Sequence, residues 1–135
     1  NVRFGDPETQ SILVRLETDL VDICEAMLSG ALDKLEIKWT TGSSACVILA
    51  SEGYPGKART GDVINGLAEA AQIPNTAIFH AGTSKDTAGN FITAGGRVLG
   101  VTAVGPDLNN ALASAYEAVS KISWPGMQYR KDIGK

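Results

Sequence analysis

Apolar residues are spaced as in helices over about the first thirty residues and as in strands over most of the remainder. Pro7 suits the first turn of a helix, so a helix is expected over residues 8–16. A second helix is expected to be capped by Thr18 and to end at Gly30. Its apolar residues recur at spacings of three and four, which predicts a stripe that faces a core. The residues of this stripe are Leu20, Cys24, Met27 and Leu28.

From residue 35 onward the apolar residues follow the period of two that is typical of β-strands. Residues 35–39 alternate between apolar and charged, which predicts a half-buried strand, and residues 44–51 predict a more buried one. Thr41-Gly42-Ser43 predicts the turn of a hairpin between them. Residues 63–71 leave helix and non-helix open, since alanines favour a helix and Gly66 opposes it. Further strands are expected at 78–80, 90–93 and 97–104.

The clearest helix lies near the end of the chain, where Asp107 is a candidate cap and Trp124-Pro125-Gly126 ends the pattern. One face of this helix is apolar and comprises Leu108, Ala111, Leu112, Ala115, Val119 and Ile122. These elements together predict an α+β fold with a mostly antiparallel sheet and packed helices. A domain boundary is expected between the parts 1–33 and 34–135.

Composition narrows the class of protein. The chain has 135 residues, 44% of them hydrophobic, which suffices for a core. A net charge of −3 gives no general attraction to nucleic acid or to an anionic membrane, and apolar stretches such as 45–50 are too short to cross a bilayer. Cys24 and Cys46 are interpreted as reduced core thiols of a cytoplasmic protein, and a single histidine makes a zinc site unexpected.

The first residues carry the most specific candidate chemistry. Residues 1–4 are expected to be the end of a strand, on which Asn1 and Arg3 share one face. An asparagine oxygen suits a hard cation such as Mg²⁺, and an arginine two residues later can hold a phosphate or carboxylate. Asp6 follows at the turn into the first helix. Such Asn–Arg pairs also occur in ordinary turns, so spacing alone leaves both interpretations open.

The octapeptide Arg3-Phe4-Gly5-Asp6-Pro7-Glu8-Thr9-Gln10 resembles the diagnostic motif of the glycinamide ribonucleotide synthetase (phosphoribosylamine–glycine ligase) family, within the ATP-grasp superfamily. Later blocks resemble the same family in the same order, so the resemblance covers essentially the whole chain. These blocks are Gly53-Tyr54-Pro55-Gly56, Phe79-His80-Ala81-Gly82-Thr83, Thr93-Ala94-Gly95-Gly96-Arg97-Val98-Leu99 and Tyr129-Arg130-x-Asp132-Ile133-Gly134.

The resemblance implies a ligase of purine synthesis that joins glycine to 5-phosphoribosylamine. ATP would phosphorylate the glycine carboxylate, and the amine would attack the resulting acyl phosphate. Asn1 matches a ligand of Mg²⁺ (or Mn²⁺), Arg3 matches a residue that stabilises the anionic intermediate, and Asp6 would face the substrate amine. The first 33 residues would be the end of the ATP-grasp domain and the remainder the C-terminal domain. The N-terminal and ATP-grasp lobes are missing, so the isolated chain is expected to be inactive and to retain neither ATP nor metal.

The glycine-rich blocks allow more than one interpretation. Gly95, Gly96 and Arg97 could bind an anionic substrate, or the glycine pair could only permit a bulge or close packing; the resemblance favours substrate contact. Residues 82–89 lack the ending of a P-loop, and His80 is interpreted as structural rather than as a catalytic base. The competing class is a non-catalytic module that binds a phosphosugar or forms a homodimer, with exposed Ile12, Leu13 and Leu16 favouring self-association.

Overall fold

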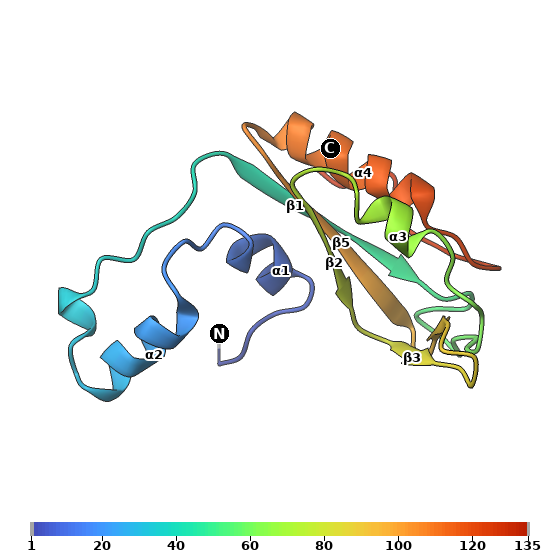
Figure 1. Ribbon diagram of the computed structural model, residues 1–135, viewed down its shortest axis with the longest axis horizontal. Coiled ribbons are helices and arrows are strands. Elements are labelled where there is room, and N and C mark those ends of the chain that lie inside the picture. The colour runs from blue at the N-terminus through green and yellow to red at the C-terminus, as the bar shows by residue number, and fades with distance from the viewer. Residues whose placement is uncertain (1, 135) are drawn as a thin grey trace.

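A computed structural model describes residues 2–134 and shows a three-stranded antiparallel sheet between helices (Figure 1). The sheet has the strand order β1-β5-β2, so the longest strand lies in the centre. The sheet strands are β1 (Ser43–Ala50), β2 (Thr76–His80) and β5 (Arg97–Gly105), and a separate hairpin joins β3 (Thr83–Lys85) to β4 (Phe91–Thr93). The helices are α1 (Glu8–Leu13), α2 (Leu20–Leu28), α3 (Leu67–Ala70) and α4 (Leu108–Lys121), with a 3-10 turn η1 (Leu32–Lys34). The predicted α+β fold with an antiparallel sheet is confirmed.

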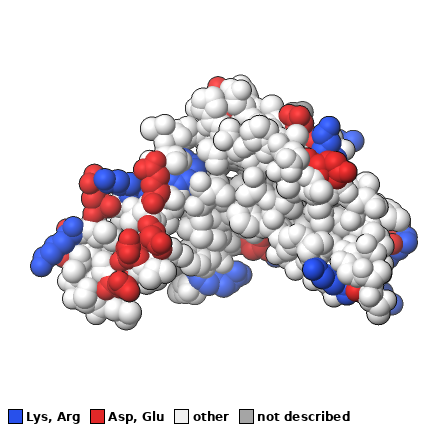
Figure 2. All heavy atoms as spheres, viewed as in Figure 1, with Lys and Arg blue, Asp and Glu red and all other residues white. Residues whose placement is uncertain are grey.

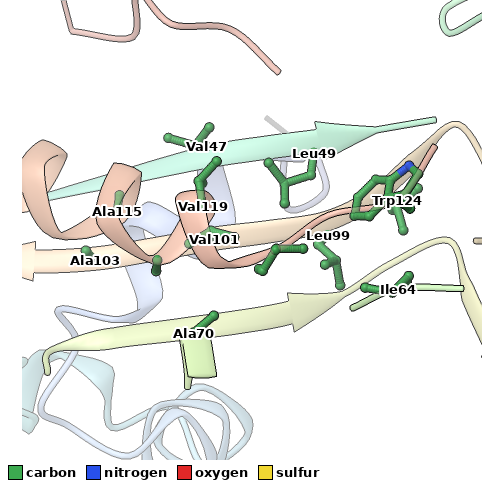
Figure 3. Close-up of a cluster of buried hydrophobic side chains, with 13 residues drawn as sticks. Val47, Leu49, Ile64, Ala70, Leu99, Val101, Ala103, Ala115, Val119 and Trp124 are labelled. Carbon is green, nitrogen blue, oxygen red and sulfur yellow. The ribbon is translucent and has the colours of Figure 1, made fainter. Parts of the chain in front are cut away.

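The main core lies between the sheet and α4 (Figure 3). Apolar residues of β1 and β5 that face α4 are buried, and the helix contributes small side chains that let it approach closely. As predicted, Asp107 caps the helix: its carboxylate accepts a hydrogen bond of 2.8 Å from the backbone N–H of Asn110. The buried cluster includes Val47, Leu49, Leu99, Val101, Ala115, Ala118, Val119 and Trp124.

Helix α1 covers the opposite face of the sheet (Figure 1). Ile48, Gly100 and Phe79 form one row across the three strands on this face. A side chain at Gly100 would contact Ile48 and, from α1, the Cγ of Gln10 at 3.9 Å. The hydroxyl of Ser44 on β1 donates a hydrogen bond of 2.6 Å to the backbone oxygen of Ser11 on α1. The N-terminal segment is thereby fixed against the sheet.

The predicted hairpin of residues 35–39 with 44–51 is wrong. Residues 35–39 form no regular strand; the segment instead follows residues 15–18, with an isolated bridge between Leu16 and Trp39. The backbone groups of residues 38 and 40 bond instead to Glu17 and Arg15, while β1 pairs with β5 from Ser43 onward. Gly42 has a φ of +95° and directs the chain away from the sheet at this point.

Three expectations for the N-terminal third are also wrong. The apolar stripe of α2 is not a core face: the helix has no buried residue, and Leu28 is 90% exposed. Cys24, on the same helix, is exposed as well, and the main neighbour of α2 is η1. Residues 2–4 form no strand, because no neighbouring strand lies beside them to accept their hydrogen bonds.

Smaller differences concern the ends and the loops. The first helix ends at Leu13, earlier than expected, and α2 is capped by Asp19 rather than Thr18. The hairpin strand β3 was not predicted. Acidic side chains gather over the α2 region as an exposed surface (Figure 2). Within residues 2–134, no helix is long and apolar enough to cross a membrane.

Candidate functional site

The five sequence blocks of the resemblance meet around the end of the sheet at which β5 begins. Two cavities lie there on the α1 side, and each is lined by blocks that are far apart in the sequence. The first cavity joins the octapeptide to the end of β2. The second joins the loop after β1, the start of β5 and the C-terminal segment. The ion pair between Asp6 and Arg97 connects the octapeptide to the segments that line the second cavity.

Asp6 and Arg97 were separate candidates in the sequence, and the structure brings them together. The Nη2 of Arg97 lies 3.2 Å from Oδ2 of Asp6, and its Nη1 donates a hydrogen bond of 3.1 Å to the backbone oxygen of Asp6. The other carboxylate oxygen of Asp6 accepts a hydrogen bond of 3.0 Å from Gln10. Both oxygens of Asp6 are therefore engaged, and Asp6 holds the guanidinium of Arg97 in place.

A β-bulge aims Arg97 toward this ion pair. The register of β1 against β5 shifts between Leu49 and Ala50, so that Leu49 faces Leu99 whereas Ala50 faces Arg97. Val98 and Leu99 are consequently both buried in the core. Without the extra residue, strict alternation would give Arg97 the same direction as Leu99, toward the core.

The glycine pair before β5 is packed closely on both sides. Oγ of Ser51 donates a hydrogen bond of 2.8 Å to the oxygen of Gly95, and the N–H of Ser51 donates one of 2.9 Å to the oxygen of Gly96. The ring of Tyr54 lies so close to Gly96 that a Cβ there would overlap it. A Cβ at Gly95 would lie 3.2 Å from Cα of Gly82, a tight contact with backbone. The close-packing and bulge interpretation of Gly95 and Gly96 therefore accounts for both glycines, and their contact with substrate stays a prediction.

The second cavity has a volume of about 320 Å³ and is amphipathic. Its apolar wall comes from Ile48 and Ala50 of β1. Its polar groups come from three different segments: Tyr54, Arg97, Gln128, Tyr129 and Arg130. The guanidinium of Arg130 donates hydrogen bonds to the carboxylate of Asp132, and these bonds raise the pKa of Arg130.

The first cavity, of about 400 Å³, lies between α1 and β2 and is lined by Phe4, Thr9, Gln10, Leu13 and Phe79 among others. His80 also borders this cavity. In the sheet it pairs with Leu99, whose side chain faces the core. Its Nδ1 lies 3.0 Å from Oγ1 of Thr83, and its ring contacts Phe91 with centroids 4.5 Å apart. These contacts give the imidazole of His80 a packing role beside the hairpin.

The remaining candidates lie at the start of the chain. Arg3 is exposed, and its Nη1 donates a hydrogen bond of 3.2 Å to the backbone oxygen of Phe4. Asn1, the expected metal ligand, lies outside the described residues. Among residues 2–134, no group of three or more His, Cys, Asp or Glu side chains could hold a metal ion.

The fold matches that of a solved ligase. The crystal structure of phosphoribosylamine–glycine ligase from Thermotoga maritima superposes with a TM-score of 0.73 and 30% sequence identity, over 98% of this chain and 32% of that chain. Among relatives, phosphoribosylamine–glycine ligase of Vigna unguiculata is 53% identical over 93% of this chain and 41% of its own length. The ligase of Pseudomonas aeruginosa is 53% identical over 99% of this chain and 31% of its own length.

Residues 44–135 match the family model described as "Phosphoribosylglycinamide synthetase, C domain". The chain belongs to this family, and the resemblance drawn from the octapeptide and the later blocks is confirmed. The chain spans about a third of the length of the relatives that it matches.

Proposed function

We propose that this chain is the C-terminal part of a phosphoribosylamine–glycine ligase that acts in purine biosynthesis. The complete ligase would join glycine to 5-phosphoribosylamine, with ATP converted to ADP and phosphate by way of glycyl phosphate. The observation that carries this proposal is the match of residues 44–135 to the family, together with the contact of the octapeptide with Arg97. Residues 1–33 would end the ATP-grasp domain and residues 34–135 would form the C-terminal domain.

The residues of this chain would bind and orient the reactants. Arg3 is exposed and would stabilise the negative charge of the glycine carboxylate and of its acyl phosphate. Asp6 would orient Arg97, which would contact the anionic substrate together with the Gly95-Gly96 turn. One carboxylate oxygen of Asp6 accepts a hydrogen bond from Gln10 and the other is paired with Arg97, so a direct contact with the substrate amine would require one of these partners to be displaced. Mg²⁺ or Mn²⁺ would neutralise the ATP phosphates, with Asn1 as one ligand.

The test compares the isolated chain with the complete ligase. Each is supplied with glycine, phosphoribosylamine and Mg·ATP, and ADP and 5-phosphoribosylglycinamide are measured. The complete ligase is expected to form both products and the isolated chain neither, because the lobes that bind ATP are absent from it. Failure of the complete ligase to form 5-phosphoribosylglycinamide would refute the proposed activity. Turnover by the isolated chain would refute the proposed dependence on the other lobes.

The alternative, a dimerisation module, draws support from the exposed apolar residues of the N-terminal third. Ile12 is 53% exposed, and Leu28 and Met27 are also exposed. Burying such a side chain contributes about 1.5–3 kcal/mol, which favours self-association of the isolated chain. Sedimentation velocity of the isolated chain is expected to show a dimer that Ile12→Glu weakens. A monomer at all concentrations would rule this alternative out.

A further inference from the structure

We propose that Arg59 is a positioning residue, whose guanidinium joins the two segments that hold the Gly95-Gly96 turn in place. Its partners are Glu52, at the start of the loop of residues 52–61, and Asp62, directly after this loop. The three residues Glu52, Arg59 and Asp62 form the Arg59 bridge. The effect of this bridge on substrate binding rests on the proposed function, in which the Gly95-Gly96 turn contacts the substrate.

The side chain and the backbone of Arg59 both take part in the bridge. Its Nη2 donates a hydrogen bond of 2.6 Å to Oδ1 of Asp62, and its Nη1 donates one of 3.3 Å to Oε2 of Glu52. The backbone N–H of Arg59 donates a third, of 2.9 Å, to the backbone oxygen of Glu52. Because a guanidinium is planar and presents its donors in a fixed fork, it sets the separation of the two carboxylates. The two ends of the loop are therefore held at a defined distance.

Glu52 attaches the bridge to one side of the turn. It follows Ser51, whose hydroxyl and N–H donate hydrogen bonds to the backbone oxygens of Gly95 and Gly96. The C-terminal segment limits the movement of Glu52 from outside, since a Cβ at Gly126 would lie 2.6 Å from Cβ of Glu52. A shift of Glu52 would therefore be passed on to Ser51 and to the turn.

Asp62 attaches the bridge to the other side of the turn, at Thr93. The N–H of Asp62 donates a hydrogen bond of 3.1 Å to Oγ1 of Thr93, and its backbone oxygen accepts one of 2.9 Å from the N–H of Thr93. The N–H of Gly61 donates a further hydrogen bond of 2.7 Å to the backbone oxygen of Thr93. Because Thr93 closely precedes Gly95 in the sequence, these bonds fix the entry to the turn.

The burial of Asp62 distinguishes this bridge from an ordinary surface ion pair. Exposed ion pairs contribute little to stability, and the side chains of Arg59 and Glu52 are 52% and 54% exposed. Asp62 is only 9% exposed, and a buried carboxylate that loses its partner is unfavourable. Arg59 does not line the second cavity, whereas Tyr54 from the same loop does. Arg59 therefore acts on the site through the loop and the turn, and not by contact with a ligand.

The experiment uses the complete ligase. Arg59→Gln removes the charge and the fork of donors, and it is expected to raise the KM for phosphoribosylamine roughly 10-fold, since a displacement of about 1 Å can cost up to about 100-fold. The kcat is expected to change less, because the loss concerns binding. The KM for Mg·ATP is expected to stay as in the wild type, because ATP is proposed to bind to the other lobes. Arg59→Lys keeps the charge without the fork, and it is expected to give an intermediate KM for phosphoribosylamine.

The matched control is Lys57→Gln, which removes the same charge from the same loop. Lys57 is exposed and forms no ion pair within residues 2–134. This variant is expected to have the KM values of the wild type. Hydrogen exchange, which requires no turnover, is expected to be faster in Arg59→Gln than in the wild type over residues 51–62 and 93–97, and unchanged in Lys57→Gln.

Four results would overturn the proposal. They are a wild-type KM for phosphoribosylamine in Arg59→Gln, an equal rise of its KM for Mg·ATP, the same effect in Lys57→Gln, or unchanged hydrogen exchange in Arg59→Gln. If the wild-type ligase forms no 5-phosphoribosylglycinamide, the proposed function fails, and hydrogen exchange then decides the positioning role of Arg59 by itself.

Discussion

Replacing Gly82 by alanine is expected to destabilise the sheet end that carries Arg97. A Cβ at Gly82 would lie 2.7 Å from the backbone oxygen of Arg97 and 2.8 Å from Cα of Gly95. Both contacts are with backbone, which cannot rotate away as a side chain could. Gly82 is also bonded on both sides, since its N–H donates to Arg97 at 2.9 Å and its oxygen accepts from Ala94 at 2.7 Å. The added methyl group must therefore separate these segments or break a hydrogen bond.

The magnitude follows from this geometry. Forcing one extra carbon into a packed site costs about 1–3 kcal/mol. For a chain of this size, about 1 kcal/mol lowers the unfolding temperature by roughly 4 °C, so a fall of about 4–12 °C is expected. Fluorescence of Trp124, which is 6% exposed, reports unfolding of the core. Trp39 is 46% exposed and is replaced by phenylalanine in all variants so that Trp124 gives the signal.

Gly56→Ala is the matched control. A Cβ at Gly56 would meet only the backbone oxygen of Gly53, at 3.2 Å, in an exposed loop that can adjust. This variant is expected to change stability by about 0.5 kcal/mol or less. Equal unfolding temperatures for Gly82→Ala and Gly56→Ala would refute the claim that the approach of Gly82 to Gly95 is tight.

Two further expectations concern titration and thiol chemistry. Hydrogen bonds from the backbone and side chain of Asn110 lower the pKa of Asp107. The stability that this carboxylate contributes is therefore fully present above its unfolded-state pKa of about 3.9. It is lost as the pH falls through the lower pKa of the folded state. Asp107→Asn keeps a capping side chain without this titration, so thermal unfolding below about pH 4 should depend less steeply on pH than in the wild type; parallel curves would contradict this. Burial raises the pKa of the Cys46 thiol, whereas Cys24 is exposed. A thiol reagent at neutral pH should modify Cys24 in the folded chain and Cys46 only after unfolding, and mass spectrometry showing equal rates would contradict the structure.

The elements predicted well are those specified by local sequence. The helix after Asp107 has its cap, its apolar period and its ending within one segment, and the structure agrees closely. The long apolar run of β5 was equally clear. The hairpin predicted for residues 35–39 is wrong because alternation predicts a strand but not its partner, and these residues lie against residues 15–18 instead of β1. The stripe of α2 failed for a related reason: periodicity shows that a face is apolar and not what covers it.

The candidate site divides in the same way. The octapeptide and the glycine-rich blocks could be found by their residues, and Arg97 was among the candidates. The contact of Asp6 with Arg97 could not be found, since it depends on a bulge in the pairing of β1 with β5 and joins residues 91 positions apart. No role could be assigned to Arg130 within its C-terminal block, because Arg130 and Arg97 come to line the same cavity only in the folded chain.

Arg97 lies at the point where the two parts of the proposed ligase site meet. On one side its guanidinium is bonded to Asp6, within the octapeptide that also holds Arg3. On the other side it lines the cavity that contains Arg130. Because the bulge turns Arg97 out of the core and Asp6 holds its guanidinium, the octapeptide and this cavity are kept at a fixed distance by the protein itself. A fixed distance of this kind is what the proposed role of these residues, orientation of the reactants, requires.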